Sequence, residues 1–253
     1  MNEEAIQRAA YLIRKAKHAV ALTGAGISTP SGIPDFRSPD SGLWQSANPF
    51  EVASIFGFKR HPQAFYDWIR PLARIVLEAQ PNPAHIALAE MEQRGYIKSI
   101  ITQNIDMLHR RAGSREVYEV HGHLRKVTCI ECFTEYAAEP IILKFLQDSK
   151  VPRCPECQGV LKPNVILFGE QLPVRELFAS QQAARRSDLM LVAGSSLEVA
   201  PAGNLPDMAR LHGARLIIIN YEPTHADSIA DLVFHEDVAD VLPHIAAAVM
   251  EDE

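Results

Sequence analysis

The four cysteines of this 253-residue chain form two Cys-x-x-Cys pairs. Cys129 pairs with Cys132 and Cys154 pairs with Cys157, and 21 residues separate the two pairs. Each pair places two sulfur atoms on one tight turn, and two such turns facing each other give a tetrahedral set of thiolates that suits Zn²⁺. Because four thiolates fill every coordination position, we expect a structural metal that activates no water. The alternatives are a redox-active dithiol or two disulfides.

Short apolar runs alternate with helix-like stretches along most of the chain. The apolar runs cover residues 18–24, 97–101, 189–193 and 215–219, and the helix-like stretches cover 3–17, 83–94, 174–186, 201–212 and 238–250. Strands that are apolar on both faces and alternate with helices indicate a parallel sheet covered on both sides. The pattern therefore predicts an α/β fold with a Rossmann-like, doubly wound parallel sheet.

Two segments interrupt this alternation. Residues 36–80 are rich in aromatic side chains and are broken by prolines, and residues 124–162 carry the cysteines. We expect the first to be a helical insertion and the second a zinc-binding module, which together form a smaller zinc-ribbon and helical domain. Residues 1–35, 81–123 and 163–253 would form the main nucleotide-binding domain. Ligands of such sheets bind at the carboxyl ends of the strands, in clefts between lobes.

Composition excludes several classes of protein. The formal net charge is −6, so the chain lacks the broad basic field that non-specific nucleic-acid binding needs. The acidic N-terminus does not resemble a secretory signal, and no apolar run approaches the ~20 residues of a membrane span. We therefore expect a soluble, cytoplasmic protein in which thiolates survive for zinc. No signal indicates a particular oligomeric state.

A glycine-rich turn follows the first apolar run directly. Gly24, Ala25 and Gly26 would let the backbone approach a pyrophosphate closely, with amide N–H groups available to the anion. The spacing Gly-x-Gly-x5-Gly departs from the usual dinucleotide fingerprint, which weighs against an NAD dehydrogenase. An ordinary tight turn between strand and helix is the alternative. Next come Asp35, Phe36 and Arg37, which are able to grip and cover a cofactor or simply to form a local ion pair.

Polar residues follow the other predicted strands as well. Thr102-Gln-Asn-Ile-Asp106 offers an amide and a carboxylate that suit a primary carboxamide, although Asn104 and Asp106 are also good helix caps. His121 ends a further short strand, where a general base is well placed. The last two runs are followed by Gly194, Ser195, Ser196, Asn220, Tyr221 and Glu222. Hydroxyls at these strand ends suit a phosphate and an Asn or Glu suits ribose hydroxyls, and ordinary turn and cap chemistry is the alternative.

Taken together, these segments resemble the sirtuin family of NAD-dependent protein deacylases, of the bacterial and archaeal type. The resemblance spans nearly the whole chain and keeps the family's order. It is carried by residues 24–37, Thr102–Asp106, His121-Gly122, the two cysteine pairs, Phe168-Gly-Glu170, Gly194-Ser-Ser196 and Asn220.

The resemblance implies roles for individual residues. His121 would be the general base, with Asn104 as the second catalytic residue, and the four cysteines would bind zinc. Ile166, Phe168 and Gly169 would contact the acyl-lysine substrate, whose peptide would pair with this segment as a strand. The NAD contacts would come from Gly24, Ala25, Gly26, Ser28, Asp35, Phe36, Arg37, Gln103, Asn104, Ile105, Asp106, His121, Gly194, Ser195, Ser196, Asn220, Tyr221 and Val238.

The activity implied is NAD-dependent deacetylation of lysine in a protein or peptide, with nicotinamide, free lysine and 2′-O-acetyl-ADP-ribose as products. Members that prefer succinyl or malonyl groups carry a Tyr-x-x-Arg pair, and aligning by eye places Tyr66 and Ile69 there, with Arg70 one residue away. Neutral acyl groups are therefore favoured, because an anionic chain would lack a charge partner. The alternatives are ADP-ribosyl transfer, glycohydrolysis, removal of longer neutral acyl groups, or a zinc-ribbon adaptor without catalysis.

Overall fold

The computed structural model of the protein describes residues 2–35 and 52–251. Its larger sheet has six parallel strands in the order β3-β2-β1-β7-β8-β9. Each of the four predicted apolar runs forms one of these strands. Their bounds are β1 Ala19–Thr23, β2 Ile97–Thr102, β3 Val117–Glu119, β7 Leu189–Ala193, β8 Arg215–Ile219 and β9 Leu232–Phe234.

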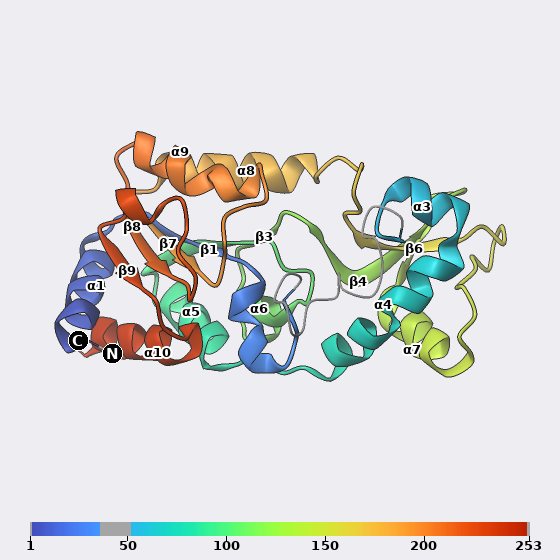
Figure 1. Ribbon diagram of the computed structural model, residues 1–253, viewed down its shortest axis with the longest axis horizontal. Coiled ribbons are helices and arrows are strands. Elements are labelled where there is room, and N and C mark those ends of the chain that lie inside the picture. The colour runs from blue at the N-terminus through green and yellow to red at the C-terminus, as the bar shows by residue number, and fades with distance from the viewer. Residues whose placement is uncertain (1, 36–51, 252–253) are drawn as a thin grey trace.

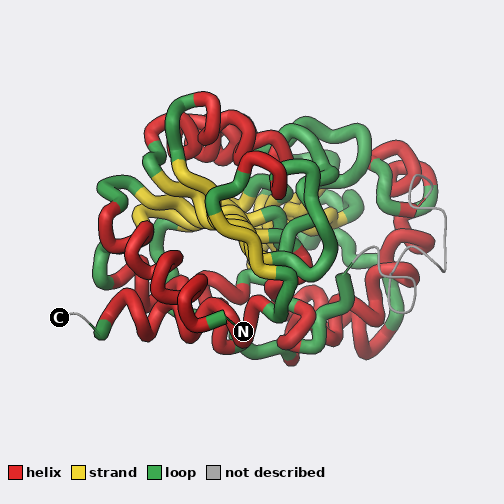
Figure 2. The backbone as a smooth tube through the Cα atoms, turned by 60° about the vertical axis from the view of Figure 1, so that its left-hand side comes forward, coloured by secondary structure: helices red, strands yellow, loops and turns green. Residues whose placement is uncertain are grey.

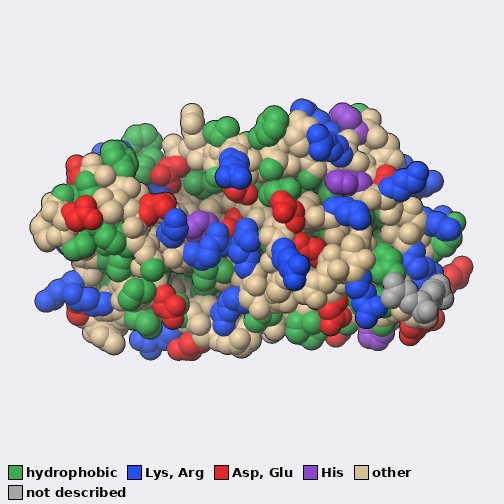
Figure 3. All heavy atoms as spheres, turned by 180° about the vertical axis from the view of Figure 1, so that it is seen from behind, with side chains coloured by type: hydrophobic (Ala, Val, Ile, Leu, Met, Phe, Trp, Pro, Cys, Tyr) green, Lys and Arg blue, Asp and Glu red, His purple; other side chains and the backbone are tan. Residues whose placement is uncertain are grey.

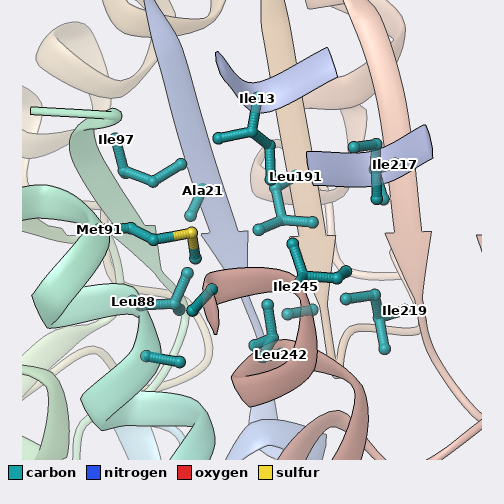
Figure 4. Packing of buried hydrophobic residues seen from close by; sticks show 14 of the residues in the cluster. Ile13, Ala21, Leu88, Met91, Ile97, Leu191, Ile217, Ile219, Leu242 and Ile245 are labelled. Atoms are coloured by element: carbon teal, nitrogen blue, oxygen red, sulfur yellow. The ribbon is translucent and has the colours of Figure 1, made fainter. Parts of the chain in front are cut away.

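Helices cover both faces of this sheet, as Figures 1 and 2 show. One face carries α1 (Glu3–Lys15), α5 (Pro83–Gln93) and α10 (Val238–Met250), and the other carries α8 (Val174–Arg186) and α9 (Leu205–Leu211). Figure 4 shows side chains of α5 and α10 packed against those of β1, β7 and β8. The sheet is buried on both faces, which is why its strands are continuously apolar. The predicted α/β doubly wound class is confirmed.

A second, three-stranded sheet forms the core of the smaller lobe. It is antiparallel, in the order β5-β4-β6, with β4 spanning Gly122–Cys129, β5 Glu135–Ala137 and β6 Leu161–Val165. The helices α3 (Ile55–Arg60), α4 (Pro62–Glu78) and α7 (Ala138–Asp148) lie beside it at the opposite end of the molecule from α1 and α10 (Figure 1). The aromatic rings of Phe58, Phe65 and Tyr66 fill the space between sheet and helices.

Pro62 and Pro71 do not interrupt α4, although the sequence suggested that prolines break this segment. Pro62 occupies the first turn of α4, where a missing N–H costs nothing, and the helix continues through Pro71 for its full 17 residues. The other short elements within residues 2–35 and 52–251 are α6 (Leu108–Arg111) and the 3₁₀ turns η1 Ala25–Ile27, η2 Thr29–Ser31, η4 Ala202–Asn204 and η5 Asp227–Ile229.

The strand order reverses between β1 and β7, at the centre of the large sheet. In open α/β sheets ligands bind outside the carboxyl ends of the strands at such a reversal. The loops after β1 and β7 meet there, and Gly26 N donates to Gly194 O at 2.9 Å. A Cβ atom on Gly24 would lie 2.8 Å from Gly194 O, and one on Gly194 would lie 2.2 Å from Ile27 N. Only glycines allow the two loops to approach this closely.

The chain crosses from the large sheet to the small one through Val120 and His121, between the end of β3 and the start of β4. Gly122 adopts φ +80°, and a Cβ atom there would lie 2.1 Å from Asn164 O on β6. An ion pair links the two strands that flank the crossing. Both terminal nitrogens of Arg125 on β4 donate hydrogen bonds to the buried carboxylate of Glu119 on β3.

We expect Gly122→Ala to lower the free energy of unfolding by about 2–4 kcal/mol, the sum of left-handed backbone strain and overpacking against Asn164. Gly213→Ala is the matched control, since Gly213 also has positive φ (+94°) but a Cβ atom there would meet no other atom within 4 Å. The control should lose only the strain of about 1 kcal/mol. Denaturant titration measures both, and equal losses would contradict the crowding argument.

Candidate functional site

The carboxyl ends of the central strands bring the predicted polar residues together, and the place where they meet, where an open α/β sheet binds its ligand, is called the crevice. Gln103 follows β2 and its backbone N–H donates to Thr23 O at the end of β1, at 3.0 Å. The Gln103 side chain reaches across β1 and donates to Ser195 Oγ, which follows β7, at 2.8 Å. Segments that are far apart in the chain therefore contribute to a single site.

Ser28, Asn104 and Asp106 form a buried hydrogen-bonded chain at the base of this crevice. Ser28 Oγ donates to Asp106 Oδ2 at 2.7 Å and accepts from Asn104 Nδ2 at 3.1 Å, and Asn104 Nδ2 also lies 3.0 Å from Gly24 O. Burial raises the pKa of Asp106, while hydrogen bonds from Leu108 and Ser28 oppose that shift. A carboxyl group and an amide are thus presented together, as recognition of a primary carboxamide requires.

His121 lies at the crossing between the two sheets, at the edge of the same crevice. Its Nδ1 is 3.0 Å from Gln103 O. Since a carbonyl oxygen only accepts, Nδ1 carries the proton and Nε2 of the neutral ring keeps its lone pair. Burial lowers the pKa of His121, and the hydrogen bond to Gln103 partly opposes the shift. The neutral ring, which is the form that takes up a proton, therefore predominates at pH 7.

Two further histidines, which the sequence interpretation did not assign, lie beneath this site. The rings of His85 and His109 pack edge to face with centroids 4.8 Å apart, and His109 Nε2 lies 2.8 Å from Thr23 Oγ1. Burial lowers the pKa of His85 to about 4, and burial together with the charge of His85 lowers that of His109 well below its usual value. Both rings are therefore neutral at pH 7.

The four cysteines meet in the smaller lobe. Their sulfur atoms all lie within 4.8 Å of one another, with Cys129 Sγ 3.4 Å from Cys157 Sγ and Cys132 Sγ 3.7 Å from Cys154 Sγ. Sulfurs at the corners of a tetrahedron with zinc–sulfur bonds of about 2.3 Å lie about 3.8 Å apart. The donor set therefore fits Zn²⁺, and all four thiols are free rather than paired in disulfides.

The surroundings of the sulfurs also suit a metal. The backbone N–H groups of Glu131 and Gly159 point at Cys129 Sγ and Cys157 Sγ, each at 3.4 Å. A Cβ atom on Gly159 would lie 2.8 Å from Cys129 Sγ, so this glycine makes room for the sulfur. His121 is not among the clustered ligands, so the metal group and the crevice are separate.

Residues expected around the adenosine half of NAD follow β7 and β8. Gly194 and Ser195 are buried and Ser196 is half-buried, and Val238 begins α10. Asn220 Nδ2 turns to Glu222 O at 2.7 Å. Tyr221 is exposed, and its hydroxyl donates to Asp237 Oδ2 at 3.3 Å. Ala25 and Ile105 belong to the crevice loops after β1 and β2. Asp35 is half-buried, whereas Phe36 and Arg37 lie outside the described residues.

The expected substrate segment extends beyond β6. Ile166 N donates to His121 O at 2.9 Å, which places this residue beside the candidate base. Phe168 forms a bridge with Ser54, because Phe168 N donates to Ala53 O and Ile55 N donates to Phe168 O. Gly169 turns the chain with φ +86°.

Tyr66 and its neighbours do not supply polar groups to this crevice. The ring of Tyr66 is buried in the core of the smaller lobe, and its hydroxyl donates to Leu161 O at 2.6 Å. Ile69 is buried in the same core. The guanidinium of Arg70 donates to Leu146 O at 2.9 Å and lies over the ring of Phe145. In this structure the Tyr66 hydroxyl is therefore bonded inside the smaller lobe.

The fold and the site define a dinucleotide-binding α/β enzyme with a structural zinc module. The family model described as "Sir2 family" matches residues 24–201, so the chain belongs to the Sir2 family. It is 48% identical to NAD-dependent protein deacylase 2 of Archaeoglobus fulgidus over 98% of this chain and 97% of that protein. It is 47% identical to the NAD-dependent protein deacetylase of Caldivirga maquilingensis over 93% of this chain and 90% of that one.

The chain is also similar in structure to solved Sir2 enzymes. A Sir2 enzyme described for its mechanism and regulation covers 100% of both chains at 47% identity, with a TM-score of 0.91. A Sir2 complex with a p53 peptide and NAD⁺ is 42% identical, with a TM-score of 0.85 over 96% of this chain and 95% of the other. Another, 40% identical over 98% of both chains with a TM-score of 0.89, holds a deacetylated p53 peptide and 3′-O-acetyl ADP-ribose. Within the described residues of this chain, no helix is long and apolar enough to cross a membrane.

We expect Cys129→Ser to release zinc and lower the melting temperature, because one tetrahedral ligand and its charge are lost. Metal analysis of the purified variant and a thermal scan measure the two effects. Unchanged zinc content would contradict the structural-metal assignment.

The buried histidines predict sensitivity to acid. The folded-state pKa values of His85 and His109 lie below the ordinary 6.5. Below pH 6.5 the unfolded chain therefore binds protons at these histidines that the folded protein does not bind. For each histidine, the free energy of unfolding should therefore fall by about 1.4 kcal/mol for each pH unit below 6.5, until the pH reaches the folded-state pKa. Above pH 6.5 these histidines should cause no such loss. The raised pKa of Asp106 acts in the opposite direction.

Comparison of variants separates these contributions. His109→Gln should flatten the fall in unfolding free energy between pH 6.5 and 5 by about 1.4 kcal/mol per pH unit. His212→Gln, at an exposed position, should leave the slope unchanged. Urea titrations at several pH values measure the slopes, and parallel curves for wild type and His109→Gln would rule the histidine out.

Proposed function

We propose that this protein removes acyl groups, acetyl first, from lysine side chains of proteins or peptides in a reaction that consumes NAD⁺. The products are nicotinamide, free lysine and 2′-O-acyl-ADP-ribose. The observation that carries the proposal is the neutral ring of His121, oriented by Gln103 at the edge of a crevice lined by glycines and by the Ser28–Asn104–Asp106 chain. The Sir2 relatives named as deacetylases and deacylases support the same reaction.

The loops after β1 and β2 are proposed to bind NAD⁺. Gly24 and Gly26 would let the pyrophosphate approach the backbone, with Ser195 and Asn220 at the adenosine end. Gln103 and Asn104 would contact the nicotinamide ribose. Ile105 and Asp106, with Ser28 nearby, would hold the nicotinamide carboxamide. NAD⁺ supplies an activated bond between nicotinamide and C1′ of its ribose. The residues around that bond would hold the acyl oxygen close to C1′, which matters because an amide oxygen is a weak nucleophile.

His121 is proposed to accept the proton of a ribose hydroxyl at Nε2. Its Nδ1–H stays bonded to Gln103 O, so the ring remains in one orientation while the charge forms. The lowered pKa of His121 keeps the ring unprotonated at neutral pH. Activity should therefore fall as the pH drops through the pKa of His121. Asn104 is proposed as the second catalytic residue because its amide lies between Gly24 and Ser28.

The segment 166–169 is proposed to receive the substrate peptide as an added strand. Phe168 uses both backbone groups on residues 53–55, so the backbone N–H and C=O of the next residue, Gly169, are proposed to pair with the peptide. Ile166, beside His121, would line an apolar passage for the acyl-lysine. Such a passage favours an uncharged acyl-lysine over an ammonium ion, whose desolvation is costly.

The proposed preference for neutral acyl groups rests on the side chains of α4. The hydroxyl of Tyr66 and the guanidinium of Arg70 are both bonded to backbone carbonyls inside the smaller lobe, so neither is free to pair with a succinyl or malonyl carboxylate. An anionic acyl chain would be buried without a counter-charge from this helix.

The proposal also covers the domain division, the partners and the location of the protein. Residues 1–35, 81–123 and 163–253 are proposed to form the NAD-binding domain, and 36–80 and 124–162 the smaller one. The small sheet runs slightly past these bounds, from Gly122 in β4 to Val165 in β6. Neither nucleic acid nor membrane is a proposed partner. On the face in Figure 3, basic side chains lie among acidic and apolar ones. A reducing, cytoplasmic location suits the four thiolates.

We expect His121→Ala to lower deacetylation by at least about 10²-fold, the usual contribution of a general base, while zinc content and melting temperature stay unchanged. NAD⁺ binding should persist. Product formation from an acetylated peptide, isothermal titration with NAD⁺ and a thermal scan measure the three properties. A large loss of thermal stability would contradict the catalytic assignment.

Mass spectrometry of products from NAD⁺ and a panel of acylated peptides tests the reaction itself. Deacylated peptide and acyl-ADP-ribose should form in equal amounts with nicotinamide. Peptide that gains ADP-ribose, or nicotinamide release without deacylation, would favour transfer or glycohydrolysis instead.

A further inference from the structure

A largely buried ion pair lies within the proposed substrate segment and the strand before it, and the reaction described above does not use it. Lys162, in β6, places Nζ 3.0 Å from Glu170 Oε2, and the side chains are only 11% and 22% exposed. Burial lowers the pKa of Lys162, and the charge of Glu170 and its hydrogen bond oppose the shift. An ammonium ion buried this far is costly unless its donors are satisfied.

The donors of this ammonium ion are satisfied inside one short stretch of chain. Besides Glu170, Lys162 Nζ donates to Pro163 O at 3.1 Å and to Val165 O at 2.8 Å. An ammonium group has three N–H donors, and three oxygens of residues 163–170 accept them. The side chain thereby fixes the path of the chain where it leaves β6.

Glu170 closes the other end of the stretch. Its Oε2 accepts from Leu167 N at 2.8 Å, and its own N–H donates to Leu167 O at 3.0 Å. Both backbone groups of Leu167 are therefore occupied within the turn, and both groups of Phe168 bond to residues 53–55. Within the described residues, no backbone hydrogen bond is recorded for Gly169. The ion pair thus decides which backbone groups of the segment remain for a second strand.

We propose that Lys162 and Glu170 are positioning residues that hold segment 165–170 in the shape that accepts the substrate peptide. The inference rests on the proposed deacylase function and deepens it. The pair lines a cavity of about 590 Å³ together with Ile166, so it borders the same space as this proposed acyl-lysine contact. No residue of the NAD crevice bonds to either side chain among the hydrogen bonds described. The pair should therefore govern peptide affinity rather than NAD⁺ affinity.

The test compares Lys162→Met and Glu170→Gln with wild type. Each variant should raise the KM for an acetylated peptide by at least about tenfold, the effect of one lost charge-assisted hydrogen bond. The KM for NAD⁺ at saturating peptide should stay within about twofold. In Lys162→Met, hydrogen exchange at the Leu167 amide should also become at least about tenfold faster, since Glu170 loses the cation that anchors it.

The same sheet offers a matched control. Lys126 on β4 and Glu135 on β5 form an ion pair of the same residue types, but both side chains are about half exposed. Lys126→Met and Glu135→Gln should leave both KM values within about twofold, because exposed pairs contribute little. If Lys162→Met does not yield folded, zinc-containing protein, Glu170→Gln carries the test alone.

The outcomes separate the two proposals. Wild-type protein without NAD-dependent deacylation would overturn the proposed function. An active wild type whose buried-pair variants keep their peptide KM, or lose peptide and NAD⁺ affinity equally, would overturn the positioning role alone.

Discussion

The crossing of the chain from one sheet to the other is the constraint on which the site depends. β3 is parallel and belongs to the large sheet, β4 is antiparallel and belongs to the small one, and only Val120 and His121 lie between them. A glycine at position 122 allows the turn, and the Glu119–Arg125 ion pair ties its two sides. His121 contacts both sides of the crossing, because its ring bonds to Gln103 O after β2 and its backbone O accepts from Ile166 N after β6. The proposed base therefore lies between the proposed NAD⁺ and peptide sites.

Neutral hydrogen-bonding groups, rather than cations, organise the crevice. Thr23, Ser28, Asn104 and the two histidines beneath them are buried and hydrogen-bonded or packed in contact, and burial keeps those rings uncharged. A low dielectric without a fixed counter-charge strengthens each hydrogen bond offered to a ligand. It also explains why the strands end in small hydroxyl and amide side chains.

Local sequence patterns predicted most of the fold. The apolar runs 189–193 and 215–219 and the helix 238–250 occur as expected, because a buried parallel strand has a continuous signature and α10 has a clear cap at Asp237. The cysteine spacing predicted the metal group in the same way. The pairing of Lys162 with Glu170 has no such signature, since it depends on a turn at Gly169 and on the register of β6. The burial of Tyr66 was missed because it is decided by α7 and β6, which lie far away in sequence.

The four cysteines lie at the far ends of β4 and β6, the two strands whose near ends adjoin His121 and Ile166. Cys129 is the last residue of β4, and β4 begins directly after His121. Cys154 and Cys157 precede β6, which continues into Ile166 and the segment held by Lys162. A metal that fastens the far ends of β4 and β6 together therefore fixes their near ends, where Ile166 N donates to His121 O. We therefore expect loss of the metal to loosen His121, the proposed base, together with the proposed peptide segment.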